Sequence, residues 1–281
     1  MWKKTLIIFL LHSACGKLSD FELPLDNGRK SHTITQIILD HFINISETIN
    51  VVYTFSDANI STFEGIDTIM MELEQSATLT LEHYTKIHPN MTKQSHNVVL
   101  CESIESFNSF LSTINPNYFN FQGYYLIIMP SRLCEYMSDM FATLWSLHIV
   151  NVNLLPLTSN DDDFIYTYYP FTSLDCGSTL PVQLDNYRDG KWMEKNELFP
   201  NKMKDLFNCT LSVVTFDIPP FIKIDKEEND SPNGIEVILM SVLALKMNFN
   251  IKWIYSEELW GEIYGNGDWG TSLQVKVETK T

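Results

Sequence analysis

The chain has 281 residues, of which 44% are hydrophobic and 12% aromatic, so it can build packed cores, and this argues against wholesale disorder. Its 19 basic and 35 acidic residues give a formal charge of −16, which would repel phosphate backbones and anionic membrane surfaces. We therefore expect no nucleic-acid partner, and a length that allows about two domains.

The first 16 residues have the pattern of a secretory signal peptide. Lys3 and Lys4 make the first four residues a basic segment, Thr5 to Leu11 are largely apolar, and Ser13 to Gly16 are small. This apolar run is far shorter than a bilayer requires, which favours a peptide cleaved near Cys15 or Gly16 over a membrane anchor. No later stretch of the sequence reaches 18 apolar residues, so we expect none of it to span a membrane.

Residues 17–163 alternate between strand-like and helix-like patterns. Strands are predicted at 51–55, 97–101, 124–129 and 149–155, and helices around 34–42, 66–77, 104–114 and 136–147. This alternation predicts an α/β amino-terminal domain with a largely parallel sheet. The acidic run at 161–163 is interpreted as a solvated linker, since it lacks the glycine and the spaced carboxylates of a calcium loop.

A connector is expected over residues 164–210. It begins with an aromatic strand at 164–171 and continues as a polar segment at 176–208. Removing the signal peptide leaves four cysteines, an even number in an oxidising compartment. Of the three possible pairings the simplest joins sequence neighbours, Cys101 with Cys134 and Cys176 with Cys209, and buried free thiols are the alternative.

Five tripeptides match the acceptor pattern for N-glycosylation, which agrees with passage through the secretory pathway. They begin at Asn44, Asn59, Asn90, Asn208 and Asn229. The tripeptide is common by chance, and Pro232 weakens the site at Asn229. Five acceptors behind a signal peptide nevertheless predict that some carry a glycan.

Residues 211–255 have the pattern of one βαβ unit. A β-branched strand at 211–216 is stopped by Pro219 and Pro220, which cannot donate to a sheet ladder. A polar loop at 223–233, an apolar helix at 235–249 and a second strand at 250–255 follow. This order predicts two parallel strands with a right-handed crossover. Ligands bind beyond the carboxyl ends of such strands, which is where residues 217–221 would lie.

Five short motifs occur in a characteristic order between Phe199 and Gly270. They are Phe199-Pro200-Asn201-Lys202-Met203, the strand at 211–216, Pro219-Pro220-Phe221, the helix from Gly234-Ile235-Glu236 to Met247-Asn248-Phe249, and Trp260-Gly261 with Asn266-Gly267-Asp268-Trp269-Gly270. This order resembles the first ligand-binding half of the insect variant ionotropic receptors, relatives of the ionotropic glutamate receptors. For residues 17–163 the resemblance is general, resting on alternation and position.

The resemblance implies that residues 211–270 are the first half of a periplasmic-binding-protein-like ligand-binding domain, with residues 271–281 as a tail. Such a domain is made of two chain halves with pore helices inserted between them. A small-molecule ligand and co-receptor subunits in a tetramer would then be the partners. The arginine that grips a ligand carboxylate in these receptors is not reached in this sequence.

Three residues are candidates for ligand contact within the resemblance. Phe221 matches the position where glutamate receptors place an aromatic ring over the ligand, although sealing a core is an equal alternative. Asp217 could face the cleft and attract amines, and a solvent-facing turn is the competing role. Trp269 would either pack its turn or contact ligand, and the helix start near Gly234 could seat an anion.

The sequence is therefore interpreted as the extracellular ligand-sensing portion of a chemosensory ligand-gated cation channel subunit at the plasma membrane, truncated before the pore. A secreted soluble small-molecule-binding protein is the alternative, and a transcript that continues past Thr281 into long apolar segments would decide between them. A secreted hydrolase using Glu257 and Glu258 is a third interpretation. No phosphate loop, nucleophile elbow or zinc motif is present, so no catalytic residue, cofactor or metal site is expected.

Overall fold

A computed structural model of the chain describes residues 27–42, 48–54, 66–83, 93–158, 162–224 and 232–255. The chain forms two compact units. The first unit comprises residues 1–169 and 179–200, and the second comprises 170–178 and 201–281. The chain therefore passes between the units three times.

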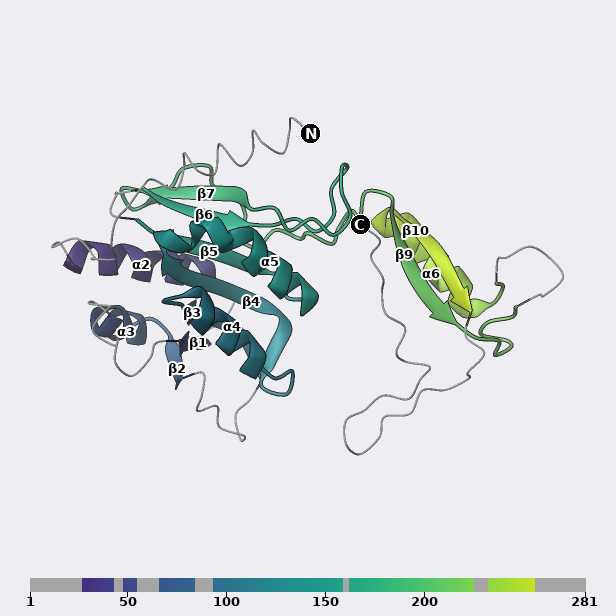
Figure 1. The fold of residues 1–281 in the computed structure, drawn as a ribbon, viewed down its shortest axis with the longest axis horizontal. Helices are drawn as coiled ribbons and strands as arrows, with labels where there is room; N and C mark the ends of the chain where they lie inside the picture. The colour runs from purple at the N-terminus through teal and green to yellow at the C-terminus, as the bar shows by residue number, and fades with distance from the viewer. Residues whose placement is uncertain are drawn as a thin grey trace. The chain divides into compact units, whose positions relative to one another are not determined.

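An eight-stranded sheet forms the centre of the first unit (Figure 1). Its strands are β1 (Thr48–Tyr53), β2 (Thr78–His83), β3 (Gln94–Leu100), β4 (Phe119–Pro130), β5 (Val152–Leu157), β6 (Asp163–Thr167), β7 (Val182–Arg188) and β8 (Lys191–Trp192). Their order is β2-β1-β3-β4-β5-β6-β7-β8, with β1 to β5 in parallel pairs and β6 to β8 antiparallel. The predicted α/β fold with a largely parallel sheet is confirmed.

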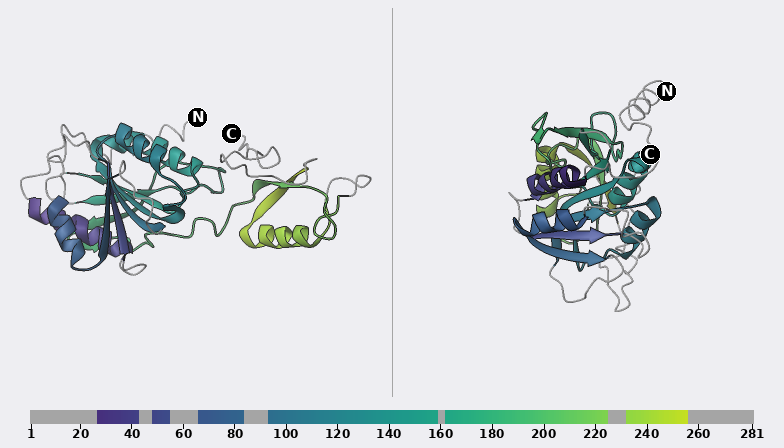
Figure 2. Two further views of the ribbon diagram at one scale, coloured as in Figure 1. Left: turned by 90° about the horizontal axis from the view of Figure 1, so that it is seen from below. Right: turned by 90° about the vertical axis from the view of Figure 1, so that its left-hand side faces the viewer.

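Helices cover both faces of this sheet (Figure 2). The helices are α2 (Asn27–Phe42), α3 (Ile66–Glu74), α4 (Ile104–Thr113), the 3-10 helix η2 (Ser131–Tyr136) and α5 (Met137–Ser146). In β4, Tyr125, Ile127 and Met129 pack with α4 and α5, whereas Leu126 and Ile128 pack with α2 and α3. Successive side chains of a strand point to opposite faces, so this strand is apolar almost throughout.

The structure corrects two expectations for the end of the first unit. The expected connector, 164–210, supplies most of β6 and all of β7 and β8 to the sheet. The expected acidic linker is also structural where it is described, because Asp163 is 1% exposed and its Oδ1 lies 2.5 Å from Lys30 Nζ. Asp162 is paired with the guanidinium of Arg188. These carboxylates tie α2 and β7 to the start of β6.

Residues 192–199, which we call the strap, lie against α2 and the sheet. Trp192 Nε1 donates to Asp40 Oδ2 at 2.8 Å, and the carbonyl oxygen of Leu198 accepts from Asn153 Nδ2 at 2.6 Å. The ring of Phe199 lies 4.9 Å from that of Tyr124, centroid to centroid. These contacts hold the strap, which is the last segment of the first unit, against α2 and the sheet before the chain enters the second unit.

His41 is buried beneath the strap. Its Nδ1 donates to the carbonyl oxygen of Ile37 at 2.6 Å, and its ring meets Trp192 and Phe199 edge to face at 5.8 and 5.5 Å. Its Nε2 is buried without a hydrogen-bond partner. Burial lowers the pKa of His41 from 6.5 to about 4, outweighing the hydrogen bond to Ile37, which raises it.

The second unit contains the predicted βαβ arrangement. β9 (Cys209–Thr215) and β10 (Phe249–Tyr255) pair in parallel along their whole length, and α6 (Ile235–Met247) connects them across one face (Figure 2). No residue of α6 is buried. The side facing away from the strands carries exposed apolar residues, each worth about 1.5–3 kcal/mol if fully buried. They are Ile235, Ile238, Leu239, Val242, Leu243 and Leu245.

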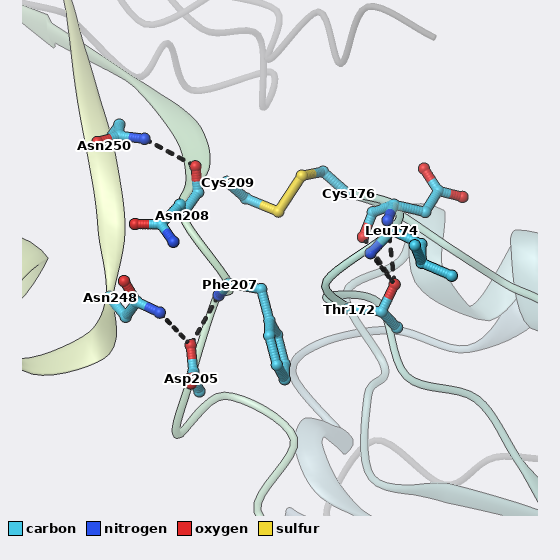
Figure 3. The surroundings of a disulfide bond; sticks show 10 residues. Thr172, Leu174, Cys176, Asp205, Phe207, Asn208, Cys209, Asn248 and Asn250 are labelled. Carbon is cyan, nitrogen blue, oxygen red and sulfur yellow. Dashed lines mark hydrogen bonds between the residues drawn. A yellow bond between two sulfur atoms is a disulfide. The ribbon is translucent and has the colours of Figure 1, made fainter.

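A disulfide joins Cys176 to Cys209 at the start of β9 (Figure 3). The other predicted pair is wrong, because the thiol of Cys101 is free and buried, whereas Cys134 is disulfide-bonded. Cys101 follows β3 with its side chain in the core beside α4, and its Sγ lies 3.2 Å from the carbonyl oxygen of Ser103. Pairing cysteines that are neighbours in the sequence fails here, because the fold, and not the distance along the chain, decides which side chains meet.

Removing one partner of the Lys30–Asp163 pair should destabilise the first unit strongly. Lys30→Met leaves the buried Asp163 carboxylate without this cation, and an uncompensated buried charge costs about 3–5 kcal/mol. The double variant Lys30→Met/Asp163→Leu should lose less than Lys30→Met alone. Urea denaturation of the natural chain, Lys30→Met, Asp163→Leu and the double variant measures the coupling, and strictly additive losses would show that the pair does not act as a unit.

Acidification should destabilise the first unit through His41. Its pKa is lowered on folding, so the unfolded chain binds the proton more tightly and stability falls as pH drops from 6.5 to about 4. The loss available from this one group is about 3 kcal/mol, from the 1.36 kcal/mol that each pKa unit represents. Denaturation curves from pH 7 to pH 4 should have a shallower pH dependence for His41→Phe than for the natural chain. Equal slopes would contradict this assignment.

Candidate ligand-binding site

The turn after β9 lies at the carboxyl edge of the two parallel strands. The Pro219–Pro220 peptide bond is cis, and the turn closes through Ile218 N–H to the carbonyl oxygen of Ile222 at 2.9 Å. Phe221 N–H donates back to the carbonyl oxygen of Ile218 at 3.0 Å. Because the prolines have no N–H, the ladder cannot continue and the chain is turned at this edge.

This turn is fastened to the start of α6. Glu236 N–H donates to the carbonyl oxygen of Phe221 at 3.1 Å, and Lys223 and Asn233 exchange backbone hydrogen bonds at 2.6 and 2.8 Å. Gly234 has φ 134°, and a Cβ there would lie 2.2 Å from the Phe221 oxygen. Only glycine fits this approach. The N–H of Glu236 is engaged within the protein, which leaves less of the helix start open to the anion considered above.

Asp217 and Phe221 belong to this one turn, and both are exposed. Asp217 Oδ1 accepts the Ile224 N–H at 2.9 Å, so the carboxylate shapes the turn while it faces solvent. The Phe221 ring is 46% exposed. The parallel register sets Tyr255 beside Thr215 at the same edge, and Tyr255 is 40% exposed. Asp217, Phe221 and Tyr255 are called the β9–β10 edge.

The chemistry of the β9–β10 edge suits a cation or an aromatic group better than a carboxylate. Aromatic faces attract cations, and a carboxylate adds negative charge. Sequence reasoning missed Tyr255, although it ends the predicted strand 250–255 and parallel strands end at one edge. The expectations for Trp269 and for Glu257 and Glu258 fall outside the described residues.

Of the five glycosylation acceptors, Asn208 alone lies in the described ranges. It is exposed and adopts φ 60° just before β9 (Figure 3). Its backbone N–H donates to the carbonyl oxygen of Asn248, and its own carbonyl oxygen accepts from Asn250 Nδ2, both at 2.8 Å. The side chain is thus held outward at the end of β9 opposite to Phe221. The signal peptide and the acceptors at Asn44, Asn59, Asn90 and Asn229 fall outside these ranges.

The first unit has a second carboxyl edge, which sequence reasoning did not single out. The strand order reverses between β1 and β3, the position where open parallel sheets bind ligands. Thr54 Oγ1 lies 3.0 Å from the carbonyl oxygen of Leu100 and 3.2 Å from Ser106 Oγ, and Ser103 and Ser106 cap α4 reciprocally. Among the described residues at this edge, these polar groups therefore satisfy one another.

Neither edge resembles an enzyme's reaction centre. Burial raises the pKa of the Cys101 thiol to about 11, which makes a thiolate nucleophile unfavourable. The described ranges contain no group of three side chains suited to hold a metal ion. None of the helices in those ranges is long and apolar enough to cross a bilayer.

Comparison with known proteins gives a family match over most of the first unit and a small part of the second. Residues 22–205 match the family described as "Putative ionotropic receptor, ligand binding domain". No curated protein matches the chain. The match ends before β9, whereas the motifs that carry the resemblance noted from sequence lie at 199–270, so the two lines of evidence rest on largely different residues. Because the matched segment covers about two thirds of the 281 residues, the chain belongs to the ionotropic receptor ligand-binding domain family and is a ligand-sensing receptor domain.

Proposed function

We propose that the chain is the extracellular ligand-sensing portion of a chemosensory ligand-gated cation channel subunit. In this proposal the chain passes through the secretory pathway to the extracellular side of the plasma membrane, where it assembles with co-receptor subunits in a tetramer. The family match over residues 22–205 is the observation that carries the proposal. The independent motif order at 199–270 supports it, because it predicts the same kind of receptor from other residues.

The second unit would form part of one of the two lobes that close on the ligand. A parallel βαβ unit with a built turn at its carboxyl edge supplies one ligand-facing surface, and closure of a second lobe would bury the ligand against it. Ligand then shifts the population from open to closed lobes, and no covalent step is required. The contribution of this chain is to present Asp217, Phe221 and Tyr255 at a fixed edge.

The side chains of the β9–β10 edge favour an amine ligand over a carboxylate. Phe221 and Tyr255 offer aromatic faces for a cationic group, and the Asp217 carboxylate adds long-range attraction for it. Trp269 remains a proposed further contact. Thermal-shift screening of the secreted chain with phenylethylamine, glutamate and glucose tests these classes side by side, and the amine should give the largest shift.

Phe221→Ala should weaken binding of that amine about tenfold while leaving the melting temperature nearly unchanged. The ring is 46% exposed, so its loss removes ligand contact more than core packing. Titration calorimetry on the two chains gives the ratio of dissociation constants, about 1.4 kcal/mol for a tenfold change.

The matched control is Phe207→Ala. Phe207 is 42% exposed and precedes β9, so it lies at the opposite end of the strand from Phe221. Its truncation should leave amine affinity unchanged. Equal weakening by both variants would remove the β9–β10 edge as the binding surface, and failure of all three ligand classes would count against ligand sensing by this chain.

Asn208 should carry an N-linked glycan if the chain passes through the secretory pathway as proposed. Asn208→Gln should remove one glycan's mass from the secreted protein, and Thr210→Ala should do the same because it destroys the acceptor while keeping the asparagine. Intact-mass measurement before and after enzymatic deglycosylation reads this out. An unchanged mass in both variants would show that the site is unused.

The channel context is tested on the transcript rather than on the protein. The proposal expects a reading frame with several long apolar segments downstream of codon 281 in at least one isoform. Their absence from every isoform would favour a secreted binding protein over a channel subunit.

A further inference from the structure

The strap is attached to the first unit by few hydrogen bonds. Residues 193–199 form no helix or strand, so no regular ladder runs through them. The N–H of Met193 and the Nδ2 of Asn196 donate to carbonyl oxygens of β7 at 2.9 and 2.5 Å. The backbone N–H groups of Glu194 and Asn196 donate to the carboxylate of Asp185 at 2.9 and 3.0 Å. A segment held in this way opens locally at a lower cost than unfolding of the whole unit.

The closed strap covers His41, which has no charged partner. His41 is 1% exposed, and the rings of Trp192 and Phe199 lie against its own ring. Its Nδ1 donates to the carbonyl oxygen of Ile37, and its Nε2 is buried without a partner. Neither ring nitrogen forms an ion pair with a carboxylate of the described residues. A proton on Nε2 would therefore be buried without an acceptor.

Other titratable groups surround this cluster without neutralising His41. Those on the elements packed around it are Asp40 on α2, His96 on β3, Tyr124 on β4, and Asp185 and Tyr187 on β7. The charged residues of the strap, Glu194, Lys195 and Glu197, are exposed. Asp40 is exposed and bound to the indole of Trp192. His96 is half-buried, and its ring contacts are with Phe42 and Tyr124, not with the strap.

We propose that the strap is a pH-sensitive switch, which opens when His41 takes up a proton. Under the closed strap the imidazolium would lose its water of hydration without gaining a carboxylate. Ring faces attract a cation, but by less than the hydration that is lost. When the strap is open, Nε2 can donate to water. The proton therefore binds the open form more tightly, and acid raises the population of that form.

The size of the effect follows from the two protonation equilibria. Burial lowers the pKa of His41 from 6.5 to about 4 in the closed form, whereas an exposed histidine keeps a pKa of about 6.5. The equilibrium constant for opening should therefore rise about twentyfold from pH 7 to pH 5, and it should level off below pH 4. The closed strap is most stable above pH 6.5.

Opening of the strap changes the link between the two units. The strap ends at residue 199, and the chain enters the second unit at 201. A closed strap anchors this passage to α2 and the sheet, whereas an open strap adds residues 192–199 to the free chain ahead of β9. Buried histidines are the usual source of such switches between neutral and acidic surroundings. The switch goes beyond the ligand binding proposed above and does not depend on it.

Hydrogen exchange of the full secreted chain, read by mass spectrometry, tests the switch. Amides of residues 193–196 report the strap, and those of 126–128 in β4 report unfolding of the unit. After correction for the intrinsic effect of pH on exchange, the strap should be less protected than β4 at pH 7 and at pH 5. Its protection should fall about twentyfold between them. Equal protection of the two segments would show that the strap opens only with the whole unit, which overturns the proposal.

Two histidine variants assign the proton. His41→Phe keeps a ring under the strap but does not titrate, so strap protection should change less than about twofold from pH 7 to pH 5. His41→Leu makes the same comparison with a smaller side chain, so the result does not depend on how well phenylalanine fits. His96→Phe is the matched control, because burial also lowers the pKa of His96 although its ring does not contact the strap. It should keep most of the twentyfold change. A full pH response in the His41 variants, or its loss in His96→Phe, overturns the role of His41.

Discussion

The buried carboxylate of Asp185 is the interaction on which the end of the first unit depends. Asp185 lies in β7 with no exposed surface, and its two oxygens accept the backbone N–H groups of Asn186, Glu194 and Asn196 at 2.7, 2.9 and 3.0 Å. These bonds fold the chain back after β8 and direct it along the strap. Without them the buried carboxylate would be unsatisfied and the strap would have no fixed beginning. The aromatic contacts of Trp192 and Phe199 then complete the seal over His41.

The two units solve the burial of apolar surface in opposite ways. The first unit covers both faces of its sheet, so its central strands are apolar almost throughout and its buried carboxylates are satisfied, Asp163 by Lys30 and Asp185 by backbone N–H groups. In the part of the second unit that the structure describes, two strands pair with one helix, which is half-buried toward the strands and exposed on its other side.

Local chemistry made the second unit predictable from sequence. Pro219 and Pro220 end a β-branched run, Gly234 begins an apolar helix, and the next strand follows at once, so element type and parallel pairing were both readable. The same local reasoning failed in the first unit, where residues far apart in the sequence bind one another. β7 has polar residues such as Gln183 and Asp185, which resemble a connector until the backbone groups that Asp185 binds are known. Asp163 appeared solvated because Lys30, its partner, is 133 residues away. The sequence placed Asp217 and Phe221 at the carboxyl edge of β9, whereas the place of Tyr255 at that edge follows from the strand register.

The disulfide between Cys176 and Cys209 has a topological consequence. It closes a covalent ring that contains β7, β8, the strap and the entry into β9. A peptide bond broken anywhere inside that ring, between residues 176 and 209, leaves both fragments joined through sulfur. The receptor domain therefore tolerates a single proteolytic nick within this segment without shedding β9, α6 and β10, for as long as its surroundings stay oxidising.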